Sequence, residues 1–338
     1  MAHRNIPVFI PHLGCPHQCV FCNQRSISEQ SDFSIAQVDQ IICRALSTIP
    51  VTDEVEIAFF GGSFTGIERS LMVSLLEIAQ KYVNEGRVNS IRLSTRPDYI
   101  SNDILDLLSA YSVKTIELGL QSMSNKVLEA SGRGHSVHDA VLACRAVVER
   151  GFDLVGQMMI GLPQSSPRDE LETAEQICRL GATAARIYPT VVFYETPLAE
   201  LTSAGIYEPL SLADAVRRSA DVLEVFLENG VECIRIGLCA TESLTSDEKV
   251  MAGPNHAALG ELVWNEYYYK KLSALVRATE SEGKEITLSL PSELVSKVVG
   301  QHRSNIKRLL REYGTTVKKS LKATDAHGIS ILPERGVN

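Results

Sequence analysis

Three cysteines within eight residues constrain this chain more than any other feature. Cys15, Cys19 and Cys22 follow the spacing C-x-x-x-C-x-x-C, shortly after an apolar run near the N-terminus. Thiolates hold iron–sulfur clusters, and a cubic [4Fe–4S] cluster normally takes four of them. Three thiols on one loop therefore leave one iron without a protein ligand. A cluster needs such an open position if it is to bind a substrate.

Two other uses of closely spaced cysteines fit this chain less well. A zinc site of the C-x-x-C type usually has a second pair of ligands, and the sequence has no such pair. A disulfide framework would need partner cysteines and an oxidising compartment. Five further cysteines have no metal-ligand spacing, and we expect them to be small core residues: Cys43, Cys144, Cys178, Cys233 and Cys239.

The composition is that of a globular protein, with 44% hydrophobic and 22% charged residues among 338. The chain has no run of eighteen apolar residues, so no transmembrane helix and no membrane association are expected. Its N-terminus has neither the apolar core nor the cleavage site of a secretory signal. We therefore expect a reducing, cytoplasmic environment, which also suits cysteines that are not paired.

Short apolar runs rich in β-branched residues alternate with longer segments of helical period. The predicted strands are Ile6–Ile10, Val55–Phe60, Ser90–Thr95, Thr115–Leu120, Leu154–Ile160, Ala185–Val192 and Val231–Gly237. The predicted helices are Ile35–Ile49, Leu71–Asn84, Asn102–Tyr111, Val137–Glu149, Pro167–Leu180 and Leu212–Glu228. This alternation predicts a parallel sheet of βαβ units. Six or seven such units fit a partial or full barrel better than an open doubly wound sheet.

The cysteine loop resembles the signature of the radical S-adenosylmethionine (SAM) enzymes, which typically fold as a partial (β/α)6 barrel. The resemblance implies that Cys15, Cys19 and Cys22 bind three irons of a [4Fe–4S] cluster and that SAM chelates the fourth. Reduction then cleaves SAM to methionine and a 5′-deoxyadenosyl radical, which abstracts a hydrogen atom. An external electron donor such as ferredoxin or flavodoxin is implied. The cofactor carries this chemistry, while the protein positions it.

Polar motifs follow several predicted strands, at the strand ends where barrels of this kind place their active sites. The stretch from Gly61 to Thr65 resembles the motif that binds the SAM amino group, although a tight strand-to-helix turn would also explain its two glycines. Gln121 matches a residue that contacts the ribose, and Arg133 one whose fork pairs with the carboxylate. The SAM contacts that the resemblance implies are Phe21, Gly61, Gly62, Ser63, Thr65, Ser94, Gln121, Arg133 and Gln157.

Within this superfamily the chain most resembles the radical SAM core of the catalytic subunit of Elongator, which modifies wobble uridines of tRNA. The resemblance covers about residues 5–235. Oxygen-independent coproporphyrinogen oxidases share some motifs less closely. No segment after Gly237 resembles the acetyltransferase domain of that subunit, so its carboxymethylation chemistry does not simply transfer. The matching stretches are Ser94–Tyr99, Glu117–Ser122, Arg133–His135, Met158–Pro163 and Ile187–Leu198.

The C-terminal part is basic, although the whole chain has a net charge of −8. Nine Lys and Arg against three Glu between residues 284 and 322 give +6, which leaves −14 for the rest. A basic module on an acidic body indicates an anionic partner. Ile286–Leu290 alternates as a strand does, and a helix with apolar Ile306, Leu309 and Tyr313 ends at Gly314.

The order strand, helix, glycine turn, helix, strand in this region resembles a KH domain. Residues 298–307 resemble the KH loop, whose G-x-x-G clamps a nucleic-acid backbone, with Arg303 in place of the second glycine. A small α+β cap with a solvated basic face is the alternative interpretation. The RNA contacts that the resemblance implies are Lys297, Gly300, Gln301, His302, Arg303, Lys307 and Arg308.

Together these features predict an α/β protein with a partial (β/α)6 TIM-type barrel and a small α+β KH-like domain. The barrel is expected over residues 1–238, a helical bridging segment over 239–283 and the KH-like domain over 284–338. The predicted function is that of a cytoplasmic radical SAM enzyme that modifies RNA, with tRNA as the first candidate. Two alternatives stay open: radical chemistry on a small molecule such as a tetrapyrrole, and an iron–sulfur RNA-binding sensor without turnover.

Overall fold

The computed structural model describes residues 2–10, 15, 19–22, 33–238, 249–318, 322–323 and 329–332. It consists of two compact units, the larger comprising Met1–Ala215 and Val225–Ala257 and the smaller Val216–Glu224 and Ala258–Asn338. The described residues of the predicted bridging segment 239–283 divide between these units, and the division of the chain into three domains stays a prediction. Of the residues discussed above, Cys239 and residues 11–14, 16–18 and 23–24 around the cysteines lie outside the described residues.

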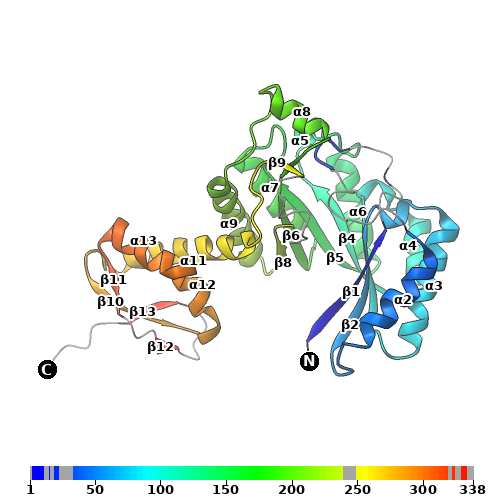
Figure 1. The fold of residues 1–338 in the computed structure, drawn as a ribbon, viewed down its shortest axis with the longest axis horizontal. Coiled ribbons are helices and arrows are strands. Elements are labelled where there is room, and N and C mark those ends of the chain that lie inside the picture. Colours follow the sequence, from blue (N-terminus) through cyan, green and yellow to red (C-terminus); the bar gives the residue numbers. More distant parts are fainter. Residues whose placement is uncertain are drawn as a thin grey trace. The chain divides into compact units, whose positions relative to one another are not determined.

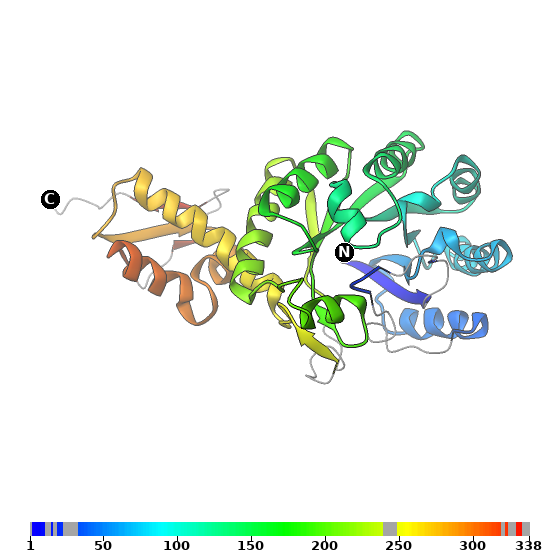
Figure 2. The ribbon, with the colours of Figure 1, turned by 90° about the horizontal axis from the view of Figure 1, so that it is seen from above.

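A curled sheet of seven parallel strands forms the centre of the larger unit, in the order β1-β2-β3-β4-β5-β6-β8. The prediction of a partial barrel of parallel strands is confirmed. The sheet is open between β1 and β8, so it makes a half-barrel with helices on its outer side (Figures 1 and 2). The strands are β1 (His3–Ile10), β2 (Glu54–Gly61), β3 (Ser90–Thr95), β4 (Val113–Gln121), β5 (Asp153–Ile160), β6 (Ala184–Pro189) and β8 (Glu232–Ile236).

Helices follow the strands in alternation, as predicted. Several begin after a serine that accepts a hydrogen bond from a backbone N–H of the first turn, and Ser136 and Ser166 form full capping boxes with Asp139 and Asp169. The helices of the larger unit are α2 (Ile35–Leu46), α3 (Arg69–Asn84), α4 (Asn102–Ser109), α5 (Asn125–Ala130), α6 (Val137–Glu149), α7 (Pro167–Arg179), α8 (Pro197–Ser203) and α9 (Leu212–Glu228), of which the smaller unit takes Val216–Glu224.

Side chains on the strands alternate between an apolar, buried outer face and an inner face that mixes polar, charged and apolar residues. On β5, Met158 and Ile160 are fully buried, whereas Gln157 and Met159 are only partly buried. On β6, the partly buried residues are Arg186 and Tyr188. The concave face of the half-barrel therefore carries the polar and charged side chains of these strands and is accessible in part, while the outer face supplies the core.

Two expectations for the larger unit are wrong. The strand predicted over Ala185–Val192 ends at Pro189, whose lack of an N–H disfavours continuing the ladder, and Val192–Phe193 forms a separate strand β7 that pairs with β9 (Val250–Ala252). Cys43 is exposed rather than a core residue, because the buried stripe of α2 runs through Val38, Ile42 and Leu46. Cys144 is buried as predicted, and Cys178 and Cys233 are partly buried.

The smaller unit is built around strand β10 (Glu285–Leu290), which pairs in parallel with β11 (Thr316–Val317) and β12 (Lys322–Ala323) and antiparallel with β13 (Ser330–Leu332). Its helices are α11 (Leu259–Ala278), α12 (Val295–Val299) and α13 (Ser304–Tyr313). The core joins α11 to the strands and consists of Tyr269, Leu272, Val276, Ile286, Leu288, Leu290, Val298, Ile306, Leu309 and Val317.

The element order from β10 to β11 is the predicted strand, helix, glycine turn, helix, strand. The assignment of this unit to the KH fold stays a prediction. Within the part of the chain that the structure describes, none of the helices is long and apolar enough to cross a bilayer.

The contact between β5 and α7 generates a stability prediction. A Cβ added to Gly156 would lie 2.6 Å from Cγ2 of the fully buried Ile177. We expect Gly156→Ala to destabilise the protein by about 1–3 kcal/mol in urea denaturation, because a close-packed interface cannot absorb the added methyl group. Ile177→Ala leaves a cavity of its own, so the double variant should lose less than the sum of the two single losses. Strict additivity would contradict this packing argument.

Candidate functional site

The carboxyl ends of the parallel strands gather most of the residues that the sequence predicts as SAM contacts. Thr65, just after β2, and Thr95, at the end of β3, are both buried and share a hydrogen bond of 2.6 Å between their hydroxyl oxygens. Ser63, two residues before Thr65, is also buried. The backbone N–H of Gly62 donates to the carbonyl of Ile10 at 2.8 Å. The loop after β2 is thereby fixed to the ends of β1 and β3.

The cysteine segment is tied to the far side of this edge. The backbone N–H of Val20 donates to the carbonyl of Ser131, after α5, and the carbonyl of Val20 accepts from Leu198 of α8. The N–H of Cys22 closes a turn onto the carbonyl of Cys19 at 3.0 Å. Phe21 packs with an apolar cluster that includes Leu198, so the segment has firm contacts on both sides.

Arg133 links the cysteine segment to strand β4. Its guanidinium donates to Sγ of Cys19 at 3.2 Å and to the carbonyl of Gly119 at 2.6 Å, and the residue is 6% exposed. Its Nε has no partner among the described residues. The cation that the sequence assigns to the SAM carboxylate therefore lies against one of the predicted cluster ligands.

Arg96 is a second buried cation at this edge, which the sequence analysis did not select. It pairs with Asp98 through two nitrogens, at 2.9 and 3.0 Å, and it donates to the backbone carbonyl of Arg133. Burial alone would lower the pKa of Arg96, but Asp98 and then Cys19 and Cys15 raise it above its usual value. Arg96 thus remains a cation beside two cysteines. Its position directly after β3, at a strand end where such sites lie, could have identified it from the sequence.

Gln121 ends β4 with a positive φ of 65°, a conformation that side-chain-bearing residues seldom adopt. Its Oε1 is buried and has no partner among the described residues. A Cβ on Gly119 would lie 3.0 Å from Nε2 of Gln121 and 3.4 Å from a guanidinium nitrogen of Arg133, so the glycine leaves room for both side chains. An orphaned buried acceptor of this kind requires a ligand or a water to satisfy it.

These residues fit a [4Fe–4S] cluster with bound SAM in their chemistry. The cysteine segment carries three thiols, and two buried guanidinium groups near it can balance thiolate and cluster charge. Oε1 of Gln121 adds an acceptor that has no partner among the described residues. Among the described residues, however, no three His, Cys, Asp or Glu side chains converge as metal ligands. The structure thus places Cys19 at the site without gathering the three thiols around one point.

A layer of buried charges crosses the concave face below these strand ends. We call it the charged layer, and it consists of Glu56 (β2), Arg92 (β3), Glu117 (β4) and Arg186 (β6). Arg92 bonds Glu56 at 2.8 Å and Glu117 at 3.0 Å, and Arg186 bonds Glu117 at 2.8 Å. Both glutamates are at most 3% exposed. A sequence signal was present, since each residue places a charge within a strand that also carries fully buried apolar residues.

The charged layer reaches two predicted SAM contacts. Nε2 of Gln157 donates to Oε2 of Glu117 at 2.9 Å and to Oγ of Ser94 at 3.1 Å. Burial would lower the pKa of Arg186, but Tyr188 and Glu117 raise it above its usual value. Ser94 and Gln157 are therefore brought together by the fold, as neighbours of one buried carboxylate.

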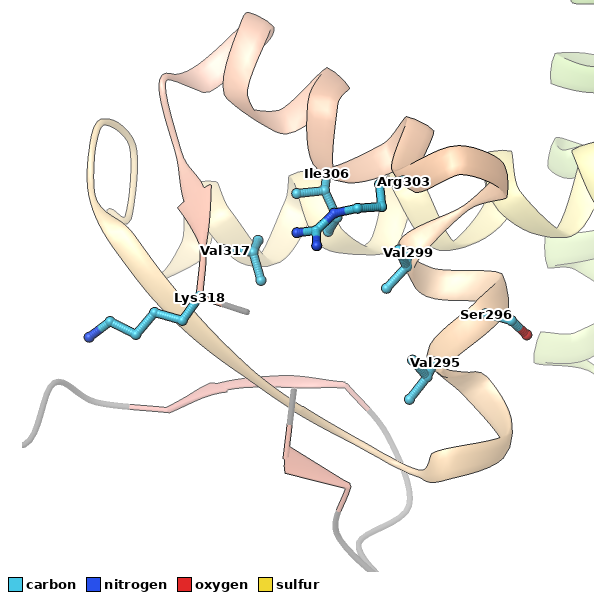
Figure 3. A pocket seen from close by; sticks show the side chains of 7 residues that line it. All are labelled: Val295, Ser296, Val299, Arg303, Ile306, Val317 and Lys318. Atoms are coloured by element: carbon cyan, nitrogen blue, oxygen red, sulfur yellow. The ribbon is translucent and has the colours of Figure 1, made fainter. Parts of the chain in front are cut away.

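The smaller unit has a pocket of about 220 Å³ between α12, the start of α13 and β11 (Figure 3). Arg303 extends from the start of α13 past Ile306 toward β11, and Lys318 lies at the opposite rim. Lys318 is missing from the predicted RNA contacts because it follows the strand rather than the glycine loop. The walls are mostly apolar, and the lining residues are Val295, Ser296, Val299, Arg303, Ile306, Val317 and Lys318.

The glycine loop beside this pocket is strongly constrained. Gly300 has φ +77°, and a Cβ there would lie 2.3 Å from Oγ of Ser304. His302 and Arg303 have positive φ values of 50° and 63°, so Arg303 adopts the left-handed conformation without being a glycine. The buried amide of Asn305 donates to the carbonyls of Asn265 and Val298, which fixes the loop to α11 and α12.

The other predicted RNA contacts have varied surroundings. Arg308 lies over the Tyr269 ring at 3.7 Å and bonds Glu266 and Glu312, so its charge is already paired. Lys297 lies over the Trp264 ring at 4.4 Å. Lys307 and His302 are exposed, Gln301 is partly buried and Gly300 is buried. Of the predicted cations, only Arg303 lines the pocket.

Comparison with protein families matches residues 9–177 to the radical SAM superfamily and residues 182–269 to a radical SAM C-terminal domain. The first match covers half of the chain. It includes the cysteine segment and strands β2 to β5.

Individual relatives are similar over parts of the chain. An uncharacterized protein of Methanocaldococcus jannaschii is 31% identical over 231 residues, which are 65% of this chain and 70% of that protein. The tRNA uridine(34) acetyltransferase of Methanocaldococcus infernus is 29% identical over 186 residues, 49% of this chain and 35% of that enzyme. The chain therefore spans about a third of the length of that acetyltransferase.

A solved structure has the same fold over most of the chain. The structure of the archaeal Methanocaldococcus infernus Elp3 with an N-terminal deletion superposes with a TM-score of 0.64 at 22% identity. The superposition covers 80% of this chain and 63% of that one.

The buried His135 generates a prediction on the pH dependence of stability. It follows Arg133 by two residues and is also influenced by the charge of Arg96. Burial, then Arg133 and Arg96, lower its pKa from 6.5 to about 4. Between these values the unfolded chain binds a proton that the folded protein does not, so stability falls as pH drops from about 6.5 to about 4, by up to about 3 kcal/mol. We expect His135→Asn to flatten this part of the curve in urea denaturation between pH 4.5 and 7. An unchanged slope would show that His135 does not contribute.

Proposed function

Because the chain belongs to the radical SAM superfamily, we propose that it binds a [4Fe–4S] cluster and SAM at the carboxyl edge of its half-barrel and uses them to modify RNA, with tRNA as the substrate class. The observation that carries the RNA substrate is the similarity to a relative named as a tRNA uridine(34) acetyltransferase. Acetyl transfer is not part of the proposal, since the chain spans only about a third of that enzyme.

In this proposal Cys15, Cys19 and Cys22 hold the cluster. A cluster held there would, once reduced, supply the electron for the reductive cleavage of SAM. Arg133 donates to the thiol sulfur of Cys19, and both Arg133 and Arg96 offset the negative charge that thiolates bring into a buried site. Gln121 offers a hydroxyl group of SAM an acceptor that no other described residue uses.

The electron comes from outside this chain in the proposal, from a ferredoxin or flavodoxin. A reducing cytoplasmic compartment belongs to the same proposal, because exposed Cys43 and the cluster ligands need to stay reduced.

The smaller unit provides the proposed RNA contact. Its pocket is smaller than the roughly 300 Å³ at which pockets for whole small ligands begin, so it suits one unpaired base of a larger molecule. Val299, Ile306 and Val317 offer an apolar surface to the base, and Arg303 offers a cation to the adjoining phosphates. Lys318 offers a second cation at the rim, where a phosphate would compete with its exposed ion pair to Glu285 at 3.4 Å. Arg303 stands where the G-x-x-G loop of KH domains has its second glycine, and its backbone has the left-handed conformation that a glycine adopts easily. The loop therefore presents a guanidinium at a position that has no side chain in the KH motif.

The SAM chemistry is tested by the formation of 5′-deoxyadenosine, measured by mass spectrometry after anaerobic reconstitution with iron, sulfide, SAM and dithionite. We expect formation that rises when bulk tRNA is added and disappears in Cys19→Ala, because two thiolates cannot hold the cluster in place. Cys43→Ala, an exposed thiol on α2, is the matched control and should behave like the wild type. If the yield of 5′-deoxyadenosine is the same with and without tRNA, a small-molecule substrate would be favoured. No formation with an intact cluster would favour a sensor.

The RNA contact is tested by the affinity for a single-stranded RNA, measured by fluorescence anisotropy over a range of salt concentrations. We expect Arg303→Glu and Lys318→Glu each to weaken binding about tenfold at low salt and to reduce the salt slope by about one. Arg277→Glu makes the same charge change at an exposed position on α11 that does not line the pocket. An equal loss in Arg277→Glu would reduce the effect to net charge and contradict the pocket assignment.

A further inference from the structure

The amide of Gln157 is held in one orientation by its neighbours. Its nitrogen donates both to Oε2 of Glu117 at 2.9 Å and to Oγ of Ser94 at 3.1 Å. A glutamine amide has two N–H hydrogens, so these two bonds use all of its donors. What remains for any further partner of Gln157 is its carbonyl oxygen.

Glu117 is what makes this orientation obligatory. Its carboxylate is fully buried. Arg92 and Arg186 both donate to its Oε1, and Nε of Arg186 lies 2.8 Å from its Oε2 as an ion pair, so two cations hold this group as a carboxylate. An ionised carboxylate accepts hydrogen bonds and cannot donate one. If the Gln157 amide were flipped, its carbonyl oxygen would face a carboxylate oxygen, with two acceptors in contact and no hydrogen between them. A serine hydroxyl could tolerate either orientation, but a carboxylate cannot.

We infer that Glu117 is a positioning residue, which acts through Gln157 and makes the concave face offer an acceptor at that point. The inference rests on the proposed function, and on the sequence-based prediction that Gln157 is one of the residues that contact SAM. It adds that the group bound by Gln157 is a hydrogen-bond donor, such as the ammonium or a hydroxyl of SAM, and not the SAM carboxylate. Gln157 and Arg133 then recognise groups of opposite character, which fixes the direction in which SAM binds.

The competing explanation is that Glu117 only stabilises the fold, and the charged layer contains a matched control for this. Glu56 is 3% exposed and also bonds Arg92, but its other contacts are with His3 and Ser90. Glu56→Gln and Glu117→Gln therefore remove the same charge from the same buried layer. Of these two glutamates, Glu117 is the one that bonds Gln157.

The experiment measures SAM affinity by equilibrium dialysis with the reconstituted holoprotein, together with the EPR spectrum of the reduced cluster with and without SAM. We expect Glu117→Gln to weaken SAM binding about tenfold, the size of one lost hydrogen bond to a charged group, and to reduce the SAM-induced change in the spectrum. Glu56→Gln should stay within about twofold of the wild type. Gln157→Leu should lose as much as Glu117→Gln, and the double variant should lose no more.

Each result decides the inference. Wild-type affinity in Glu117→Gln overturns it, and so does an equal loss in Glu56→Gln, which would point to the layer as a whole. If Glu117→Gln does not fold, Gln157→Leu decides instead, because it leaves the ion pairs of Glu117 intact, and wild-type affinity there overturns the inference. A wild-type protein that forms a cluster but does not bind SAM overturns the proposed function itself, and the inference with it.

Discussion

The strict alternation of side chains along parallel strands is the constraint on which the larger unit depends. Alternate side chains of each strand point outward, under the helices, and the side chains between them point to the concave face. The outer half is apolar and fully buried, as Met158 and Ile160 show on β5. The inner half has to meet solvent, a ligand or other polar groups, and it carries Gln157, Arg186 and their partners.

The charged layer is the consequence of that constraint on a sheet that does not close. Two carboxylates on the inner face would be costly to bury alone, but Arg92 bonds both of them and Arg186 completes the pairing of Glu117. Removing one partner from such a buried pair costs about 3–5 kcal/mol, because it leaves an uncompensated charge. The layer therefore joins strands β2, β3, β4 and β6 through ion pairs. It also gives Gln157 a hydrogen-bond partner in a fixed position.

The smaller unit solves a different problem, which is how to hold an irregular loop beside a pocket. Gly300 supplies a positive φ with no room for a Cβ, and the Asn305 amide satisfies two backbone carbonyls inside the unit. Arg303 can then keep a left-handed backbone although it is not a glycine. Arg308, five residues after Arg303, is instead paired with Glu266 and Glu312.

The sequence by itself determined the order and type of the seven strands of the main sheet and of six helices of the larger unit, because apolar periods are local signals. It did not predict the short helices α5 and α8 or the pair of short strands β7 and β9. It also indicated which strand ends carry polar residues, and it singled out Gln121, Arg133 and Gln157. It misplaced the end of β6 and the exposure of Cys43, since those depend on how one segment meets another.

Only the tertiary structure decided which polar groups become partners. That Glu117, Ser94 and Gln157 share hydrogen bonds depends on the register of β3, β4 and β5. That Arg133 lies on Cys19 depends on contacts between residues 114 positions apart. Pairings of this kind depend on distances across the sheet, and a linear pattern of residue types does not encode those distances.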